Sequence, residues 1–256
     1  MNALRRPASW IAGALLTGAV LVAVFLQQLG PEFYKDRLAR VVADSTGRTL
    51  SLEGPLSVEW WPRLRLHAEK VALQNAAGFS PTPMLAAEEI ELAVAPLPLL
   101  LGRISMDTAR VRGLSVSLVR RADGSTNWDD LAGKRASDAG GNAGALAALA
   151  LGGVDIEGAS LDWLDEVQGR QLSLDQVQAR TGALAFDLPV DFRVSARLRS
   201  SKPALEGETT FDGTVTYTPR RQRYQFAPLR VGVTLAGKAL PGGKSALSIS
   251  TELDID

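Results

Sequence analysis

From Arg48 onward, apolar residues recur at every second position along most of the chain, with polar or charged residues between them. This period of two is typical of antiparallel β-strands that have one apolar face and one polar face. Turn-forming pairs such as Gly54-Pro55 and Asp123-Gly124 separate the alternating segments. The apolar positions in the first part of this pattern are Leu50, Leu52, Leu56, Val58, Leu64, Leu66, Ile90, Leu92, Val94, Leu114, Val116 and Leu118.

The alternation stops at residues 134–153, which are rich in alanine and glycine, and returns at Val154. We therefore predict a first β unit at 48–133, a linker at 134–153 with a helical turn or two at 145–151, and a second β unit at 154–256. Apolar positions of the second unit include Val194, Val231 and Val233. Because the alternation continues to Ile255, we expect the chain to be a fragment of a longer protein.

The N-terminal segment carries a different pattern, because residues 10–29 contain no charged side chain. Twenty helical residues measure ~30 Å, the thickness of the hydrocarbon core of a bilayer. We predict a transmembrane helix at 10–29. Arg5 and Arg6 lie just before it, so the positive-inside rule predicts that residues 1–9 are cytoplasmic and that the remaining chain lies on the other side of the membrane. A cleaved signal peptide is the alternative, but Gln27 and Gln28 end the apolar run without a small-residue cleavage site.

A helical period follows at residues 31–47, where Tyr34, Leu38 and Val41 form an apolar stripe between charged residues. Pro31 suits a first helical turn, and Gly47 suits a C-terminal stop. We predict a short amphipathic helix that packs against the β structure, and that could also close one end of it.

Composition excludes several classes of function. The 28 acidic residues balance the 28 basic ones, which argues against a nucleic-acid partner. The chain has no cysteine and a single histidine, His67, which lies at a polar strand position, so we expect no metal site. Asp162, Asp165 and Glu166 lack the spacing of a calcium loop. No nucleophile or nucleotide motif is present. We expect no cofactor and no enzymatic activity.

Several segments, taken in order, resemble the N-terminal portion of the AsmA family of envelope proteins in Gram-negative bacteria. They are TGRTLSLEGPLSVEWWPRLRL (46–66), VALQNAAGFS (71–80), LPLLLGRISMDTARVRGLSVSLVRRADGSTNWDDL (97–131), GGVDIEGASLDWLDE (152–166) and ALPGGKSAL (239–247). The order of these segments along the chain is what makes the resemblance specific. The transmembrane and amphipathic helices fit the same family.

The resemblance implies a single-pass protein of the inner membrane with its bulk in the periplasm, involved in outer-membrane biogenesis. Through the related bridge-like lipid transfer proteins, it also implies phospholipid transport along a long, curled antiparallel β-sheet that forms a hydrophobic groove. The apolar positions named above would line that groove. The partners would be phospholipid, the inner membrane and other envelope proteins.

Alternation alone fits an open groove and a closed β-sandwich equally, because both need one apolar face per strand. The scarcity of aromatic residues at the apolar positions favours the groove. A non-enzymatic scaffold for outer-membrane proteins, which binds partners by strand addition, is the second functional hypothesis.

Overall fold

A computed structural model of the chain describes residues 31–59, 64–94, 104–106, 108–129, 131, 149–218 and 221–255. The transmembrane helix predicted at 10–29 lies outside these residues. Among the residues that are described, no helix is both long enough and apolar enough to cross a bilayer.

The amphipathic helix expected after the N-terminal segment is present as α2 (Pro31–Thr46). Its end follows from Gly47, which takes a φ of 73° and donates its backbone N–H to the carbonyl of Ala43 at 2.7 Å. This left-handed glycine terminates the helix and turns the chain into the first strand.

The remaining described chain is mostly β, as predicted. The strands are β1 (Leu50–Leu52), β2 (Leu56–Glu59), β3 (Leu64–Leu73), β4 (Leu85–Val94), β5 (Ile104–Met106), β6 (Ala109–Arg112), β7 (Ser115–Arg120), β8 (Leu149–Leu151), β9 (Val154–Asp165), β10 (Arg170–Thr181), β11 (Val190–Ser201), β12 (Ala204–Thr218), β13 (Arg223–Ala236) and β14 (Lys244–Ile255). A short 3₁₀ turn, η2 (Pro241–Gly243), lies between the last two strands.

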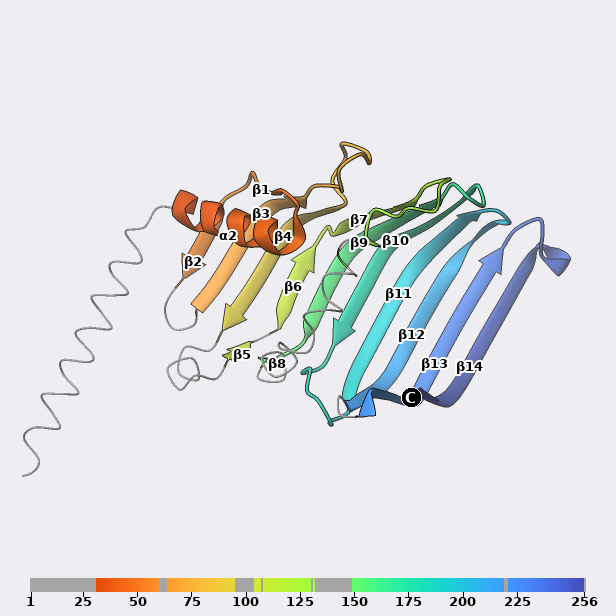
Figure 1. Ribbon diagram of the computed structural model, residues 1–256. Coiled ribbons are helices and arrows are strands. Elements are labelled where there is room, and N and C mark those ends of the chain that lie inside the picture. Colours follow the sequence, from red (N-terminus) through yellow and green to blue (C-terminus); the bar gives the residue numbers. More distant parts are fainter. Residues whose placement is uncertain are drawn as a thin grey trace, which may run out of the picture.

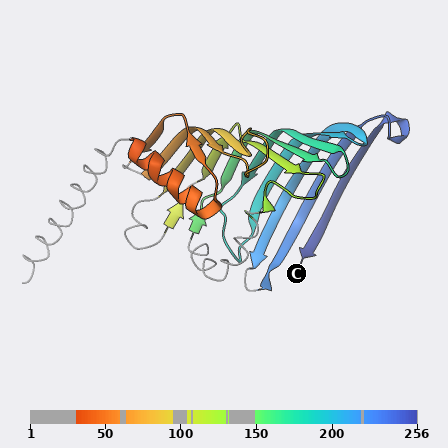
Figure 2. The same ribbon diagram turned by 45° about the horizontal axis from the view of Figure 1, so that its top comes forward.

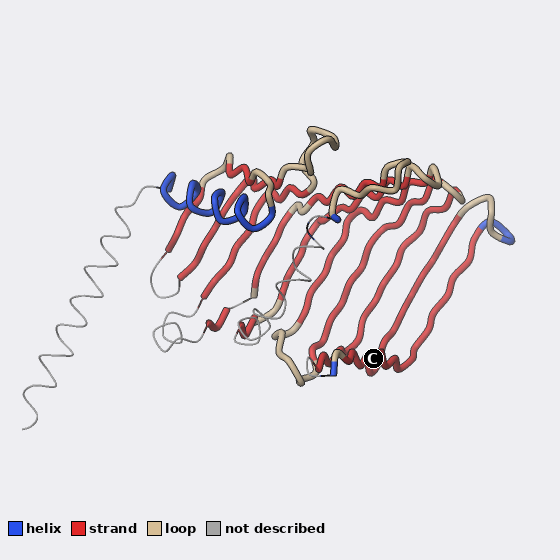
Figure 3. Tube along the Cα trace, viewed as in Figure 1, coloured by secondary structure: helices blue, strands red, loops and turns tan. Residues whose placement is uncertain are grey.

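All of these strands belong to one 14-stranded sheet, with the main order β1-β3-β4-β6-β9-β10-β11-β12-β13-β14. The sheet twists along its length, with α2 at one end and β14 at the other (Figures 1 and 2). Figure 3 shows that strands dominate the described chain and that α2 lies beside the first strands. A sandwich needs two sheets packed face to face. The described strands form a single sheet, so the sandwich alternative is wrong for this part of the chain.

The prediction of a purely antiparallel sheet is also wrong, because the sheet is mixed. β9 runs parallel to both β6 and β7, and β5 runs parallel to β8. Parallel neighbours need a long crossover, which the chain between Arg120 and Val154 provides. Side chains alternate in the same way in parallel and antiparallel strands, so the sequence pattern could not indicate that β9 runs parallel to β6 and β7.

The alanine- and glycine-rich segment contains a strand where helical turns were predicted. β8 lies within 145–151 and pairs with β5 at Ile104↔Leu149. Both predicted β units therefore belong to the same sheet, joined through β6, β7 and β9.

Candidate functional site

One face of the sheet is apolar from end to end, and the register shows how it is assembled. In the first half, Leu56 lies opposite Ala68, and Ala68 lies opposite Ile90. Directly opposite residues on neighbouring strands point to the same face. The complete cross-strand row is Leu56, Ala68, Ile90, Val111, Ile156, Ala179, Val194, Phe211, Val231 and Ile249. We call the face that carries this row the apolar face.

The neighbouring row, shifted by one residue along each strand, is polar throughout. It consists of Ser57, His67, Glu91, Arg110, Asp155, Arg180, Arg193, Asp212, Arg230 and Ser250. Because side chains alternate along a strand, this row lies on the opposite, polar face. The two faces are therefore segregated across the whole length of the sheet.

Most of the residues predicted to line a groove are brought together by this register. Each of them lies directly opposite another apolar residue on a neighbouring strand. The cross-strand pairs are Leu50↔Leu73, Leu52↔Val71, Val58↔Leu66, Leu66↔Leu92, Leu64↔Val94, Leu85↔Val116, Val116↔Leu161, Leu118↔Trp163, Val194↔Phe211 and Val233↔Leu247. Leu114 is outside the strands, in the break between β6 and β7, where its carbonyl accepts the N–H of Ser160 at 2.7 Å. That these residues line a lipid groove stays a prediction.

The apolar face is covered at one end and uncovered at the other. Near α2, Leu56 and Val71 are only 6% and 7% exposed, and Leu38 of the helix packs against them. At the far end, Leu247 is 55% exposed and Ile249 is 43% exposed. Exposed aliphatic side chains in a contiguous row mark a surface that binds an apolar partner. The exposure of the apolar face therefore increases from α2 toward β14.

A buried polar contact directly follows α2. Arg48 is 4% exposed, and its Nη2 donates to the carbonyl of Asn127 at 2.5 Å. The fully buried side chain of Asn127 donates to the Oδ1 of Asn75 and to the carbonyl of Ser117, both at 2.9 Å. Its Oδ1 accepts the N–H of Val119 at 2.9 Å. This contact ties the helix end to the sheet and to the segment after β7.

The sequence pattern predicted a turn at Asp123 and Gly124, and neither Asn127 nor Arg48 was among the predicted site residues. The turn is present at Asp123 and Gly124, with Gly124 at a φ of 86°. The buried hydrogen bonds of Asn127 could not be predicted from the hydrophobic pattern, because a loop asparagine can be recognised as buried only once its hydrogen-bond partners are known.

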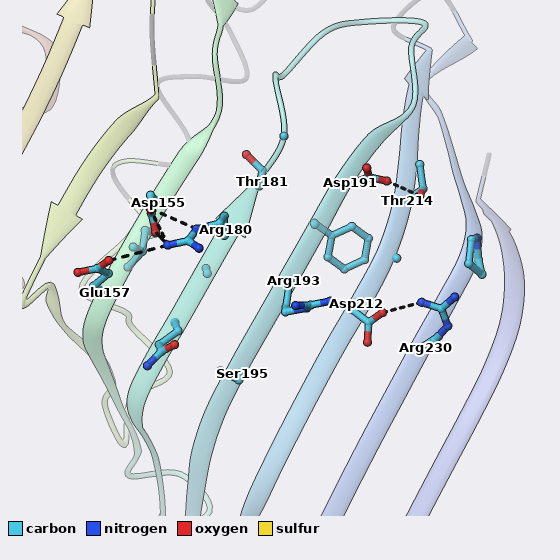
Figure 4. Close-up of a pocket in the computed structure, with 17 residues that line it drawn as sticks. Asp155, Glu157, Arg180, Thr181, Asp191, Arg193, Ser195, Asp212, Thr214 and Arg230 are labelled. Atoms are coloured by element: carbon cyan, nitrogen blue, oxygen red, sulfur yellow. Dashed lines mark hydrogen bonds and ion pairs between the residues drawn. The ribbon is translucent and has the colours of Figure 1, made fainter.

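Ion pairs across neighbouring strands organise the polar face. Arg180 donates from Nη2 to the Oδ2 of Asp155 at 2.9 Å, and Arg230 donates from Nη1 to the Oδ2 of Asp212 at 2.8 Å (Figure 4). The hydrogen bond to Asp155, followed by the attraction of its charge, raises the pKa of Arg180 above the ordinary value of an arginine. These side chains are solvated, so their main effect is to fix pairing register rather than to add much stability.

Two hollows lie over the polar face, one of about 910 Å³ around Arg180 and Arg193 and one of about 1000 Å³ around Arg197 and Glu208. Their walls carry several charged side chains that pair with each other, as Arg180 does with Asp155 and Arg199 with Asp175. Among the described residues no group of three or more histidine, cysteine, aspartate or glutamate side chains could hold a metal ion. His67 lies on this face, as expected, with its ring nitrogens 3.2 Å from Glu69 and 3.4 Å from Glu89.

Asp162 lies inside β9, Asp165 is the last residue of that strand, and Glu166 begins the hairpin turn to β10. Asp165 is 1% exposed, accepts the N–H of Gln168 at 3.1 Å and lies 3.9 Å from Arg120. Its oxygens are therefore used inside the fold.

Comparison with known proteins decides the family. The family model described as "AsmA family" matches residues 1–248. The chain belongs to the AsmA family. It is also similar to Protein AsmA of Escherichia coli (strain K12), at 30% identity over 95 residues, which is 37% of this chain and 15% of that protein. The matched stretch thus spans a small part of the AsmA protein, although the family match covers nearly the whole chain. The resemblance expected from the ordered segments is confirmed.

The apolar face is continuous across the sheet and is exposed at the β14 end, whereas the polar face carries paired charges.

Proposed function

We propose that this AsmA-family chain is an envelope protein, anchored in the inner membrane, that carries phospholipid along its apolar face and so contributes to outer-membrane assembly. The continuous apolar row from β2 to β14 supports the proposal most directly. At ~4.8 Å per strand, that row extends for about 45 Å.

Such a surface would lower the cost of moving a lipid tail through water. Exposing a chain of roughly 16 carbons costs about 13 kcal/mol, at ~0.8 kcal/mol per methylene. A row of valine, isoleucine and leucine side chains replaces water along the tail and needs no specific polar recognition. Catalytic residues are not required for this activity.

Mass spectrometry of the purified full chain tests the proposal. We expect phospholipid to copurify, and we expect Val116→Asp to reduce the amount retained per mole of protein, because Val116 lies between Leu85 and Leu161 on the apolar face. Delipidated protein that takes up no phospholipid would contradict the proposal.

A scaffold role is the second candidate, favoured by the position of β14. Every position of this strand is exposed, and in the described part of the chain β14 pairs only with β13. A free strand edge can recruit a partner by strand addition. Crosslinks from β14 to an envelope protein, in a chain that retains no phospholipid, would favour this candidate over lipid transport.

A further inference from the structure

The helix α2 covers one end of the apolar face. Leu56, Ala68 and Val71 are 6%, 7% and 7% exposed, and Leu38 of α2 packs against them. We call Leu56, Ala68 and Val71 the covered cluster. Leu56 and Ala68 begin the cross-strand row that continues through Ile90 to β14. The surface under α2 is therefore part of the same surface that is exposed at the far end of the sheet.

Few of the apolar side chains described in α2 are buried against the sheet. Among them, Leu38 packs against the covered cluster, whereas Val41, three residues later, is 55% exposed. The helix contacts mainly the short strands β1 and β2 (Figures 1 and 2). A segment with few buried apolar contacts opens at a lower free energy than the rest of a fold. We therefore expect α2 to leave the sheet more readily than the long strands β9–β14 separate from each other.

A glycine separates α2 from a fixed point on the sheet. Arg48 is 4% exposed and donates from Nη2 to the carbonyl of Asn127, so the chain is anchored directly after the helix. Gly47, which is exposed and has a φ of 73°, lies between Arg48 and α2. Glycine changes its backbone angles at the lowest steric cost. A hinge at Gly47 can therefore move α2 while Arg48 stays in place.

An acyl chain is a suitable replacement for α2 on the sheet. Moving α2 alone would expose the covered cluster to water, at a cost that is proportional to the apolar area. A lipid tail across the same residues covers this area again, so the exchange of one apolar cover for another costs little. Asp36 and Arg40 of α2 are already exposed, so release of the helix changes their solvation little.

We propose that α2 is a displaceable cover, which turns about Gly47 and yields the covered cluster to the acyl chain of a phospholipid. This inference rests on the proposed function and adds a step that controls it, because the covered end accepts lipid only when α2 has moved. The transmembrane helix predicted from the sequence leads directly into α2. The cover thus lies at the end of the apolar face that follows the proposed membrane anchor in the chain.

The test uses the full chain in detergent and a phospholipid that carries a photoreactive diazirine in its acyl chain. Peptide mapping by mass spectrometry after illumination identifies the strands that the acyl chain contacts. Labels on β3, which holds Ala68 and Val71, report the covered end, and labels on β11–β14 report the uncovered part. In the wild-type chain we expect labels on β11–β14 and weaker labels on β3.

Leu38→Asp and Val41→Asp form a matched pair, because both replace an apolar side chain of α2 with the same charge. L38D removes the burial that holds α2 closed. It should raise the labelling of β3 relative to β11–β14 about tenfold, the factor that corresponds to the burial of one leucine. V41D changes a side chain that is 55% exposed and should leave this ratio unchanged. Circular dichroism checks that both variants fold.

A crosslink tests the closed position of α2 directly, since the chain contains no cysteine. Joining the two thiols of L38C/L56C with a short bismaleimide should abolish the labelling of β3 and leave the labelling of β11–β14 in place. The control variant D36C/R40C joins two exposed positions one turn apart on α2 and does not attach the helix to the sheet. Its crosslink should leave the labelling of both regions unchanged.

The outcomes separate the two proposals. Equal labelling of β3 in L38D and V41D, or labelling of β3 that survives the L38C/L56C crosslink, would overturn the displaceable cover while lipid carriage stands. Failure of that crosslink to form in the absence of lipid would overturn it as well. Absence of labels from the whole sheet would overturn the proposed function itself.

Discussion

Val194 and Ser195 are adjacent residues of β11 that point to opposite faces of the same sheet. Val194 lies between Ala179 and Phe211 in the apolar row, whereas Ser195 faces the 910 Å³ hollow on the polar side. The same aspartate at either position adds the same charge to the same strand. Val194→Asp and Ser195→Asp therefore compare the two faces with backbone, strand and net charge held constant.

The expected effect of Val194→Asp follows from the strand spacing. An extended acyl chain roughly 20 Å long crosses about four strands at ~4.8 Å each, so each strand contacts about four methylenes. At ~0.8 kcal/mol per methylene this is about 3 kcal/mol per strand. Because a single sheet covers only one side of the tail, each strand contributes about half of that amount, ~1.6 kcal/mol. We expect Val194→Asp to remove the contribution of β11. The predicted loss of affinity is about fifteenfold.

Titration of the full chain with a fluorescent phospholipid at fixed detergent concentration measures this difference. We expect Val194→Asp to bind about fifteenfold more weakly and Ser195→Asp to bind like the wild-type chain. Circular dichroism of both variants controls for folding. Equal affinities for the two variants, or a larger loss in Ser195→Asp, would refute the assignment of lipid to the apolar face.

Three further predictions concern the framework of the sheet. Asn127→Leu removes three buried hydrogen bonds, so the free energy of unfolding in a urea titration should fall by about 3 kcal/mol. Arg223→Gln should raise the pKa of Asp254 in a carboxyl NMR titration, because the hydrogen bond from Arg223 holds that pKa below its usual value. The stabilisation from this pair is complete above the unfolded-state pKa and disappears as the pH falls through the folded-state pKa, so Arg223→Gln should also reduce the loss of stability on acidification. Gly207→Ala should lower the midpoint of thermal unfolding, because a Cβ there would lie 2.0 Å from a backbone oxygen of β13, and an unchanged midpoint would contradict the β12–β13 register.

The two-residue period was sufficient to predict a mostly β chain and many, though not all, of the residues on its apolar face. Burial of apolar side chains against a partner or a helix fixes strand faces, so the pattern carries this information directly. The helix at Pro31–Thr46 was predictable for a similar reason, because its apolar stripe and its flanking Pro31 and Gly47 are local signals.

Strand direction and neighbours were not predictable in the same way. The pairing of β9 with β6 and β7 depends on how the chain returns after Arg120, and no local pattern encodes that path. β6 has only four residues, too few to show a period, so Val111 was absent from the predicted lining even though it links Ile90 to Ile156.

The charge pairs of the polar face needed the register as well. The sequence has balanced charge, but only the strand pairing shows which arginines meet carboxylates and which do not. Arg180 and Asp155 are far apart in sequence and become a hydrogen-bonded pair at 2.9 Å only because β9 and β10 are neighbours.

Gly158 and Gln176 lie at two β-bulges, which affect how the sheet tolerates insertion or deletion of a residue. Both take positive φ values, 65° and 51°, at register shifts in β9 and β10, where one extra residue is inserted into the strand. Each insertion resets the odd and even positions, so that Ala159 and Val177 stay on the same side as Ile156 and Leu174. Removal of Gln176 alone would leave Val177 and Ala179 on the side of Leu174, because the two strands would then advance in step. Removal of a residue from a regular part of β10 would instead turn Arg180 toward the apolar side and Ala179 toward the polar side. The position of a one-residue change within a strand, as much as the identity of the residue, therefore decides whether the two faces of this sheet stay separate.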